Sequence, residues 1–491
     1  MRPLSFSRRL FLLLLVCSSV SPAQEFILLG WSTSGMQATT KDFSKFALQP
    51  PGVTLRAVLL HRGFGWPWRV TQGYSVEYSI PNNGTSVTKT NFWSYAQTLF
   101  KLDQPLSPDV GLTGAGLSGQ MDTCGKFFEI SGIPATPYPD SSSVTEVPYQ
   151  FAHLTAREVS TGKIIATTDV VIPVSNEMNC VRSGCHGSAQ SLLNKHAPVT
   201  GFDRFGPVLC ASCHSSNLTT VPDAVPGGPL SLRIHRRHQT LAGAPGAIET
   251  CYMCHPGART QFFRDTMRYG TAALVCQDCH GSMESIATSI DQGRRPWADE
   301  PRCGGCHGPV FSEPPGTLYR DALGHGRLPC SSCHGSPHAI LPSIQPNDNT
   351  QSIRLQGFAG PIRECRICHM YSPPIGGPHG LTLTSIREEE DAEPGTVQLR
   401  QNYPNPFNGS TIIPVDIPVP SVIEAVVFAS TGQRVRTLSK RSYPQGSALL
   451  VWDGTDDSGK SVASGIYICR LLTTHPSGDR RNLAIQMVYL R

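Results

Sequence analysis

The stretch CSSCH, residues 330–334, places two cysteines three positions apart and a histidine directly after the second cysteine. The same CxxCH pattern occurs six times in the middle of the chain, whereas the chain's own Cys and His frequencies predict roughly 0.02 occurrences by chance. The copies are CASCH (210–214), CYMCH (251–255), CQDCH (276–280), CGGCH (303–307), CSSCH (330–334) and CRICH (365–369). A related stretch, CVRSGCHG at residues 180–187, has four residues between its cysteines.

The motif spacing suits covalent attachment of haem c. Two thiols three residues apart lie on one side of a helical turn, where both can form thioethers to the porphyrin vinyl groups, and the next histidine then faces the iron. Zinc ribbons and disulfides also use cysteine pairs, but neither needs a histidine directly after the second cysteine. The regular motifs predict six haems, and the 180–187 stretch predicts a seventh, with a single thioether as its alternative. The predicted attachment residues are Cys180, Cys185, Cys210, Cys213, Cys251, Cys254, Cys276, Cys279, Cys303, Cys306, Cys330, Cys333, Cys365 and Cys368. The predicted proximal ligands are His186, His214, His255, His280, His307, His334 and His369.

Seven haem irons need a second axial ligand each. Five further histidines lie between the motifs and one follows the last motif, and one in the preceding segment brings the number to seven. These candidate distal ligands are His196, His235, His238, His325, His338, His379 and His153. The number of these histidines nearly equals the number of irons, which favours bis-histidine haems of low potential that are closed to substrate. Met267, Met283 or Met370 is the alternative ligand at one site. The sequence does not pair individual histidines with individual motifs.

The composition of residues 176–380 sets them apart as a heptahaem domain. They hold fourteen of the seventeen cysteines and sixteen arginines but a single lysine, as expected where guanidinium groups bind haem propionates. The candidate arginines are Arg233, Arg236, Arg237, Arg264, Arg294, Arg295 and Arg302. About 205 residues leave roughly 29 for each haem, which is too few for separate apolar cores. Packed haems should therefore form the core of this loop-rich region, with short helices after several motifs.

The remaining segments predict a multidomain chain. Residues 1–23 combine three arginines with an apolar run and a Ser-Pro-Ala ending, which is typical of a signal peptide of an exported protein. Residues 24–175 contain strand-like segments and predict a β-rich domain. Residues 381–395 form an acidic linker, and residues 396–491 alternate like a small β-sandwich. After residue 23 no segment has the length of an apolar membrane-spanning helix, and the net charge of +5 gives no sign of a nucleic-acid partner.

With these residues in hand, the middle region resembles the multihaem c-type cytochromes of respiratory bacteria. The resemblance covers about 205 residues, through the seven motifs and the histidine-containing segments between them. Those segments are IHRRH (234–238), GHG (324–326), CHGSPHA (333–339) and GPHG (377–380). The resemblance implies electron transfer along a chain of haems, and it strengthens His238, His325, His338 and His379 as distal ligands.

The C-terminal segment resembles a type IX secretion sorting domain with a flagellar-hook-type immunoglobulin-like fold. The matching stretches are NYPNPFN (402–408), STGQRVRTL (430–438), WDGTDDSG (452–459) and VASGIYICRL (462–471). The resemblance implies passage to the cell surface or the medium with the secretion machinery as a partner. A plain β-sandwich that stays with the cytochrome, in the periplasm, is the alternative. Cys469 departs from the usual pattern and is interpreted as a buried thiol, with pairing to Cys124 as the alternative.

Three functions fit these features. The first is a conduit, an electron-transfer protein rather than an enzyme, that passes electrons between other redox proteins and extracellular acceptors such as minerals. The second is a multihaem reductase or oxidase of a small nitrogen or sulfur compound, which needs one open iron. The third is a haem filament formed by self-association, in which His153 or His61 reaches the iron of a neighbouring copy. Spectra separate the first two, because only the second requires a high-spin haem that binds nitrite, hydroxylamine or cyanide.

Overall fold

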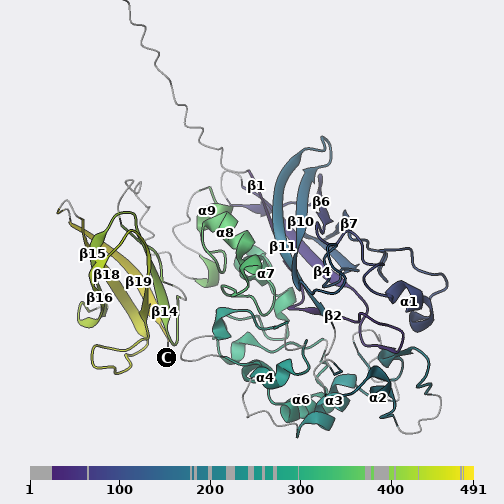
Figure 1. Ribbon diagram of the computed structural model, residues 1–491. Coiled ribbons are helices and arrows are strands. Elements are labelled where there is room, and N and C mark those ends of the chain that lie inside the picture. Colours follow the sequence, from purple (N-terminus) through teal and green to yellow (C-terminus); the bar gives the residue numbers. More distant parts are fainter. Residues whose placement is uncertain are drawn as a thin grey trace, which may run out of the picture.

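The computed structural model in Figure 1 shows a multidomain, β-rich chain with a few short helices. It describes residues 25–62, 66–176, 180–181, 185–196, 202–216, 227–240, 248–256, 260–268, 274–296, 298–370, 377–380, 397–402, 405–429, 431–475, 478 and 480–490. The predicted signal peptide and acidic linker lie outside the described residues. Within the described ranges, no helix has both the length and the apolar composition that crossing a membrane requires.

The N-terminal part is a sandwich of two β-sheets, in agreement with the strand-like segments of its sequence. Its strands are β1 (Phe26–Ser32), β2 (Gln37–Thr39), β4 (Val53–His61), β5 (Trp68–Arg69), β6 (Tyr74–Ser79), β7 (Ser118–Gln120), β8 (Asp122–Cys124), β9 (Phe127–Ile133), β10 (Tyr149–Glu158) and β11 (Ile164–Asn176). One sheet has the order β1-β4-β9-β8, with β5 on β4, and the other has the order β2-β11-β10-β6-β7. Leu59 and Phe128 of the first sheet meet Leu154 and Ile172 of the second in one apolar core.

Strand β1 is buried on both faces, which explains its unbroken apolar run FILLGWS. Alternate side chains face the sandwich core, whereas Ile27, Leu29 and Trp31 point away from it. These three residues pack against Ile362 and Ile367 of the middle region. A strand covered on both faces does not show the apolar–polar alternation of a half-exposed strand. The outer face of the first sheet is therefore an interface that supports the middle region.

A glutamine side chain covers the open edge of the same strand. Gln351, in helix α8 (Thr350–Gln356), accepts a hydrogen bond from the backbone N–H of Gly30 at 2.9 Å and donates to its carbonyl at 3.2 Å. Its oxygen also accepts from the Thr168 hydroxyl at 2.9 Å. Unpaired backbone groups at a sheet edge need partners, and here a side chain from the middle region supplies them.

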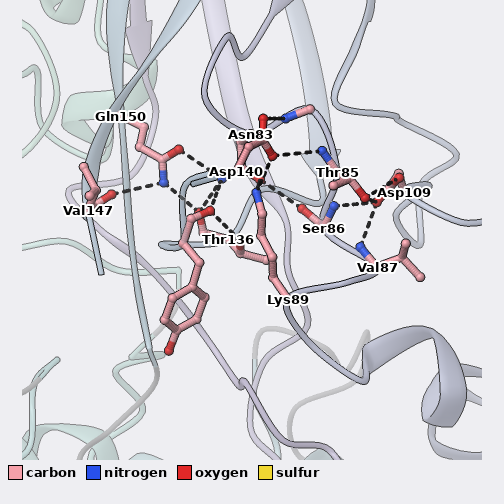
Figure 2. Close-up of polar contacts among 12 residues, drawn as sticks. Asn83, Thr85, Ser86, Val87, Lys89, Asp109, Thr136, Asp140, Val147 and Gln150 are labelled. Carbon is pink, nitrogen blue, oxygen red and sulfur yellow. Dashed lines mark hydrogen bonds and ion pairs between the residues drawn. The ribbon is translucent and has the colours of Figure 1, made fainter. Parts of the chain in front are cut away.

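A polar network, drawn in Figure 2, fixes the loop that follows β6. Lys89, whose side chain is only 3% exposed, donates to Asp140 at 2.8 Å and to Asn83 at 3.3 Å. Asp109 accepts the backbone N–H groups of Ser86 and its neighbour Val87. Burial raises the pKa of Asp140, but the hydrogen bonds from Lys89 and from backbone N–H groups outweigh it, and the net pKa is lowered. Because these charges have partners inside the network, it holds the loop in place.

The middle region consists of short helices joined by loops. Its elements are α2 (Ala189–Leu193), β12 (Val208–Leu209), η1 (Cys210–Ser212), α3 (Leu230–His238), α4 (Ile248–Tyr252), η3 (Thr266–Arg268), α5 (Cys276–His280), α6 (Met283–Asp291), η4 (Cys303–Gly305), η5 (Tyr319–Asp321), η6 (His325–Arg327), α7 (Cys330–His334), η7 (Pro346–Asn349), α8, α9 (Cys365–Cys368) and η8 (Pro378–Gly380). Five of them begin at the first cysteine of a motif, so the helical turn is the motif itself and not only the segment after it. Apolar contacts here are sparse: one small cluster joins α3 and α6 through Leu232, Ala287 and Ile290.

The C-terminal part is a second β-sandwich, as the alternating sequence predicts. Its strands are β13 (Gln398–Leu399), β14 (Thr411–Ile417), β15 (Ser421–Ala429), β16 (Arg434–Tyr443), β17 (Gly446–Trp452), β18 (Gly465–Thr474) and β19 (Arg480–Tyr489). A three-stranded sheet, β13-β14-β17, faces a four-stranded sheet, β16-β15-β18-β19. Trp452 of the first sheet is fully buried against Val427, Leu471 and Met487 of the second. Figure 1 draws this part in yellow.

Cys469 is a buried thiol in this second core, as predicted, and both it and Cys124 are free. Burial raises the pKa of the Cys469 thiol to about 12. Since the thiolate is the form that reacts, we expect Cys469 of the folded protein to resist alkylation at pH 9. Iodoacetamide reaches the partly exposed Cys124, so this thiol should react, although burial raises its pKa as well. Peptide mass mapping after iodoacetamide treatment measures both sites.

The same raised pKa predicts the sign of a pH effect. An unfolded cysteine ionises near pH 8.5, so the folded state, which keeps the proton, loses relative stability as the pH rises from there toward 12. A Cys469→Ala variant should lack this part of the alkaline loss. Rapid labelling of Cys469 in the native protein at pH 9 would contradict the burial argument.

Candidate functional site

Each regular motif closes into one turn of backbone. In the motifs that begin at residues 210, 251, 303 and 365, the histidine N–H donates to the carbonyl of the first cysteine at 2.8–2.9 Å. The motifs at 276 and 330 form the same turn as helices α5 and α7. One turn thus presents two thiols and an imidazole from neighbouring positions, which is the arrangement that covalent haem attachment requires.

The irregular 180–187 stretch ends in the same bond. The His186 N–H donates to the Cys180 carbonyl at 3.1 Å, although the spacer between the cysteines is two residues longer. Residues 182–184 of that spacer lie outside the described residues. The bond between the two ends of the stretch therefore matches that of the regular motifs.

Six motif histidines each face one histidine from outside the motifs. The ring-centroid distances lie between 5.9 and 6.4 Å. The pairs are His186–His238, His214–His196, His255–His235, His280–His338, His334–His379 and His369–His325. Every pair joins one predicted proximal ligand to one predicted distal ligand, and no histidine is used twice. Sequence reasoning named both sets of residues but left the pairing open.

The distances fit two imidazoles on opposite faces of one metal ion. Histidine–metal bonds are about 2 Å long, so two ring centroids on a common axis through the metal lie roughly 6 Å apart. The angle between ring planes varies from 13° for His235–His255 to 79° for His186–His238, as rotation about such an axis allows. Edge-to-face aromatic contacts span a similar range of about 4.5–7 Å. The one-to-one use of motif and non-motif histidines is the stronger indication.

Backbone carbonyls hold several of these rings by one nitrogen. The Nδ1 atoms of His235, His238 and His379 lie 2.7, 2.8 and 2.9 Å from the carbonyls of Ser231, Ile234 and Val310. A histidine that binds a metal commonly donates its second ring N–H to a carbonyl, which fixes the ring and the tautomer. This contact leaves Nε2 as the atom available to a metal.

Desolvation keeps the central imidazoles uncharged. It lowers the pKa of His255 and of His334 to about 4, and that of His338 to about 3. Neighbouring histidines contribute to each decrease. A neutral imidazole is the form that binds a metal, so these rings are ready to do so at neutral pH.

His338 is positioned from two sides, by Arg264, which the sequence suggests only as a partner of a propionate, and by Gly35, for which the sequence suggests no role. Its backbone has a φ of 66°, a left-handed conformation that is unusual for histidine. The Arg264 N–H donates to its carbonyl at 3.0 Å. A Cβ added to Gly35 would lie 2.2 Å from His338 Nδ1, so only glycine fits between the N-terminal sandwich and this ring. A lone glycine in a long sequence gives no signal for such a contact.

The structure does not bring two of the predicted ligands to a histidine partner. His153 lies on β10, and its Nδ1 contacts Asp169 at 2.7 Å. It therefore does not face a motif histidine, as its prediction as the seventh distal ligand requires. His307 forms the motif turn, but among the ring contacts of the described residues no histidine faces it. The structure thus gives six predicted ligand pairs and one predicted proximal ligand without a histidine opposite it.

Four of the seven candidate arginines pair with the chain's own carboxylates. Arg264 is 2% exposed, and its Nε lies 2.7 Å from Asp348. The expectation that it serves a propionate is therefore wrong for Arg264, because its guanidinium is already enclosed. Other candidates form more exposed pairs, namely Arg236–Asp291, Arg295–Asp299 and Arg302–Glu313. For the remaining candidates the propionate assignment stays a prediction.

Thiols of several different motifs lie within electrostatic reach of one another. The neighbouring thiols are Cys185 and Cys254, Cys251 and Cys276, Cys279 with Cys303 and Cys306, and Cys333 and Cys368. His307 in turn acts on His334. These contacts join the motif at 180 to the one at 251, and each motif from 251 onward to the next, up to the last motif at 365. Groups attached to these motifs would therefore be close together.

The donor set fits haem c. A haem iron takes its equatorial ligands from the porphyrin and needs only two from the protein, which a histidine pair supplies. A structural zinc site instead needs four protein ligands. The described part of the chain holds no group of three or more His, Cys, Asp or Glu side chains placed to share a metal ion. Paired imidazoles beside paired thiols are the recurring arrangement.

Comparisons with known proteins concern the C-terminal sandwich. The family model of the FlgD Ig-like domain matches residues 405–475. Similar solved structures include FlgD from Xanthomonas campestris, at 24% identity over 19% of this chain and 66% of that chain, with a TM-score of 0.16. FlgD from P. aeruginosa matches at 24% identity over 16% of this chain and 60% of that chain, with a TM-score of 0.15.

No curated protein matches the sequence closely enough to count as a relative. The matched part spans less than two thirds of the length of the two FlgD chains. Its two facing sheets, closed around Trp452, agree with the family match. Residues 405–475 therefore form an immunoglobulin-like domain of the FlgD type.

Proposed function

We propose that this chain is a multihaem c-type cytochrome that carries electrons through closely spaced, mostly bis-histidine haems. The observation that carries the proposal is the one-to-one pairing of six motif histidines with six non-motif histidines at 5.9–6.4 Å. Haem supplies one-electron iron chemistry when bound, and the protein sets ligation and spacing. The residues that would hold a haem are the two cysteines and the histidine of a motif, with the paired histidine opposite at six of the seven motifs.

The arrangement of the motifs supports conduction rather than separate storage sites. Thiols of six of the seven motifs, all but the one at 210, or the histidine beside them, lie close to a group of another motif, which favours short distances between the attached groups. Paired imidazoles saturate an iron and favour a low potential, so these sites would pass electrons and not bind substrate. The electron donors and acceptors would be other redox proteins or extracellular minerals.

The N-terminal sandwich would act as a rigid support. Its outer face packs on the segment around Ile362 and Ile367, and Gln351 pairs with its edge strand. The haem region has little apolar core of its own, so packing against the sandwich fixes the position of this part of it. The sandwich thereby contributes to the positions of the last motifs.

The C-terminal domain suggests where the cytochrome works. We take the finer resemblance to a type IX sorting domain, together with the predicted signal peptide, to mean export and display at the cell surface or in the medium. The FlgD Ig-like match is compatible with this role, and a periplasmic cytochrome with an adhesive terminal domain is the alternative.

The test of the proposed function is the intact mass of the purified protein together with cysteine counting. We expect the mass to exceed that of the polypeptide by seven haems, and the reduced spectrum to be that of a c-type cytochrome. After denaturation, iodoacetamide should label Cys124 and Cys469, but none of the fourteen motif cysteines, because thioethers do not react. A colourless protein with labelled motif cysteines would overturn the proposal, and six haems with Cys180 and Cys185 labelled would remove only the irregular site.

A further inference from the structure

One motif differs from the others in its axial partner. All sixteen histidines of the chain lie in the described part of the structure, and twelve of them form the six pairs. The remaining four are His307, His61, His153 and His475. The His61 ring lies between Phe26 and Trp68 with its Nε2 on Glu25, and His153 contacts Asp169. His475 follows strand β18 in the C-terminal domain. In the described part of the chain, no histidine ring faces His307.

The motif around His307 is otherwise complete. The His307 N–H closes the turn on the Cys303 carbonyl at 2.9 Å, as in the paired motifs. Glu313, only 5% exposed, accepts the Cys303 N–H at 3.0 Å and holds the start of the turn. The geometry of haem attachment is therefore present, and only the second imidazole is missing.

The loop of this motif is exposed to solvent, and it also contacts the histidine pair of the next motif. Residues 304–311 are exposed, including Val310 and Phe311, so small molecules from solution reach this loop. The Val310 carbonyl lies 2.9 Å from Nδ1 of His379, and the Phe311 ring lies 5.2 Å from the His379 ring. His379 is the histidine that faces His334. A haem at this motif would therefore neighbour the next one in the series.

We propose that the haem attached at Cys303 and Cys306 has His307 as its only protein ligand and binds a small exogenous ligand at its sixth position. This inference rests on the proposed function, because it requires haem at that motif. The ligand class is a small molecule with a lone pair for iron, such as carbon monoxide on the ferrous form or cyanide on the ferric form. The other six haems, each between two imidazoles, have no free position.

The first experiment uses the full-length holoprotein, with its haem number established by mass. We expect a high-spin signal from about one haem in seven, and binding of about one carbon monoxide or cyanide per chain at saturation. Electron paramagnetic resonance and visible titrations measure both quantities. Seven haems that are all low-spin and bind neither probe would overturn this inference and leave the proposed function intact, whereas a haem-free chain would remove both.

Matched variants locate the site. The double variant Cys303→Ser with Cys306→Ser should lose one haem by mass and, with it, both the high-spin signal and carbon monoxide binding. The control, Cys210→Ser with Cys213→Ser, removes a motif for which the described residues show no contact with the one at 303, so it should also lose one haem but should keep carbon monoxide binding. Retained binding in the first variant would overturn the assignment. A wild-type high-spin signal that disappears as the protein concentration rises would mean that a second copy fills the position, which also overturns it. If a variant fails to fold, the wild-type stoichiometry still decides whether one haem is open.

Discussion

Replacing His338 with alanine is expected to convert about one-seventh of the haems from low-spin to high-spin, since the chain has seven motifs. His338 is the histidine that faces His280 at a ring distance of 6.1 Å, and alanine offers no donor in its place. The desolvated ring, with a pKa lowered to about 3, is neutral over the whole working range, so the effect should be the same from pH 5 to pH 8. Near-infrared magnetic circular dichroism of the oxidised protein measures the spin state directly.

A matched control separates ligation from general damage. His153→Ala removes a histidine that the sequence also predicts as a distal ligand, but that contacts Asp169 in the structure, so its haem spectrum should equal that of the wild type. Adding Cys276→Ser and Cys279→Ser to His338→Ala should remove the new high-spin signal together with the haem. An unchanged spectrum for His338→Ala, or a new high-spin signal in His153→Ala, would contradict the pairing seen in the structure.

The histidine ligands illustrate how far sequence reasoning reaches at this site. Spacing identifies His280 as a proximal ligand, because a CxxCH turn brings the three side chains together within five residues. It also singles out His338 as a surplus histidine. The partnership between them spans 58 positions, 338 minus 280, and depends on how loops fold back, which no local pattern records. The count of seven distal ligands is reached only by including His153, and the structure places that residue in a sheet.

The fold shows the same division. The alternating stretches GYSVEYSI (73–80) and GIYICRLL (465–472) predict strands, and the structure has them as β6 and β18. Burial of every second side chain is a local property that sequence alone reveals. The packing of β1 on Ile362 and Ile367 joins residues more than 300 positions apart. The unbroken apolar run of β1 reflects that contact, because both faces of the strand are covered. A central strand of a sheet has the same kind of run, so the sequence does not identify the partner. Domain boundaries drawn from composition therefore miss that the N-terminal sandwich and the middle region share one interface.

Replacing Arg264 with methionine is expected to lower the free energy of unfolding by about 3–5 kcal/mol, the usual cost of leaving one charge of a buried pair without its partner. Arg264 and Asp348 are 2% and 6% exposed, and two guanidinium nitrogens lie 2.7 and 3.1 Å from the two carboxylate oxygens. The guanidinium also donates to the Gly35 carbonyl at 2.8 Å. This one side chain therefore links the middle region to the N-terminal sandwich. Urea titration followed by far-ultraviolet circular dichroism measures the loss.

Two further variants test whether charge burial is the cause. Arg295→Met breaks an exposed pair with Asp299 and should cost no more than about 1 kcal/mol. The double variant Arg264→Met with Asp348→Leu removes both buried charges and should recover much of the stability, because an apolar pair of similar volume is often neutral there. Since Gly35 also abuts Nδ1 of His338, Arg264→Met should in addition loosen that ligand and raise the high-spin fraction. A loss for Arg264→Met no larger than that for Arg295→Met would mean that the buried pair does not hold the two domains together.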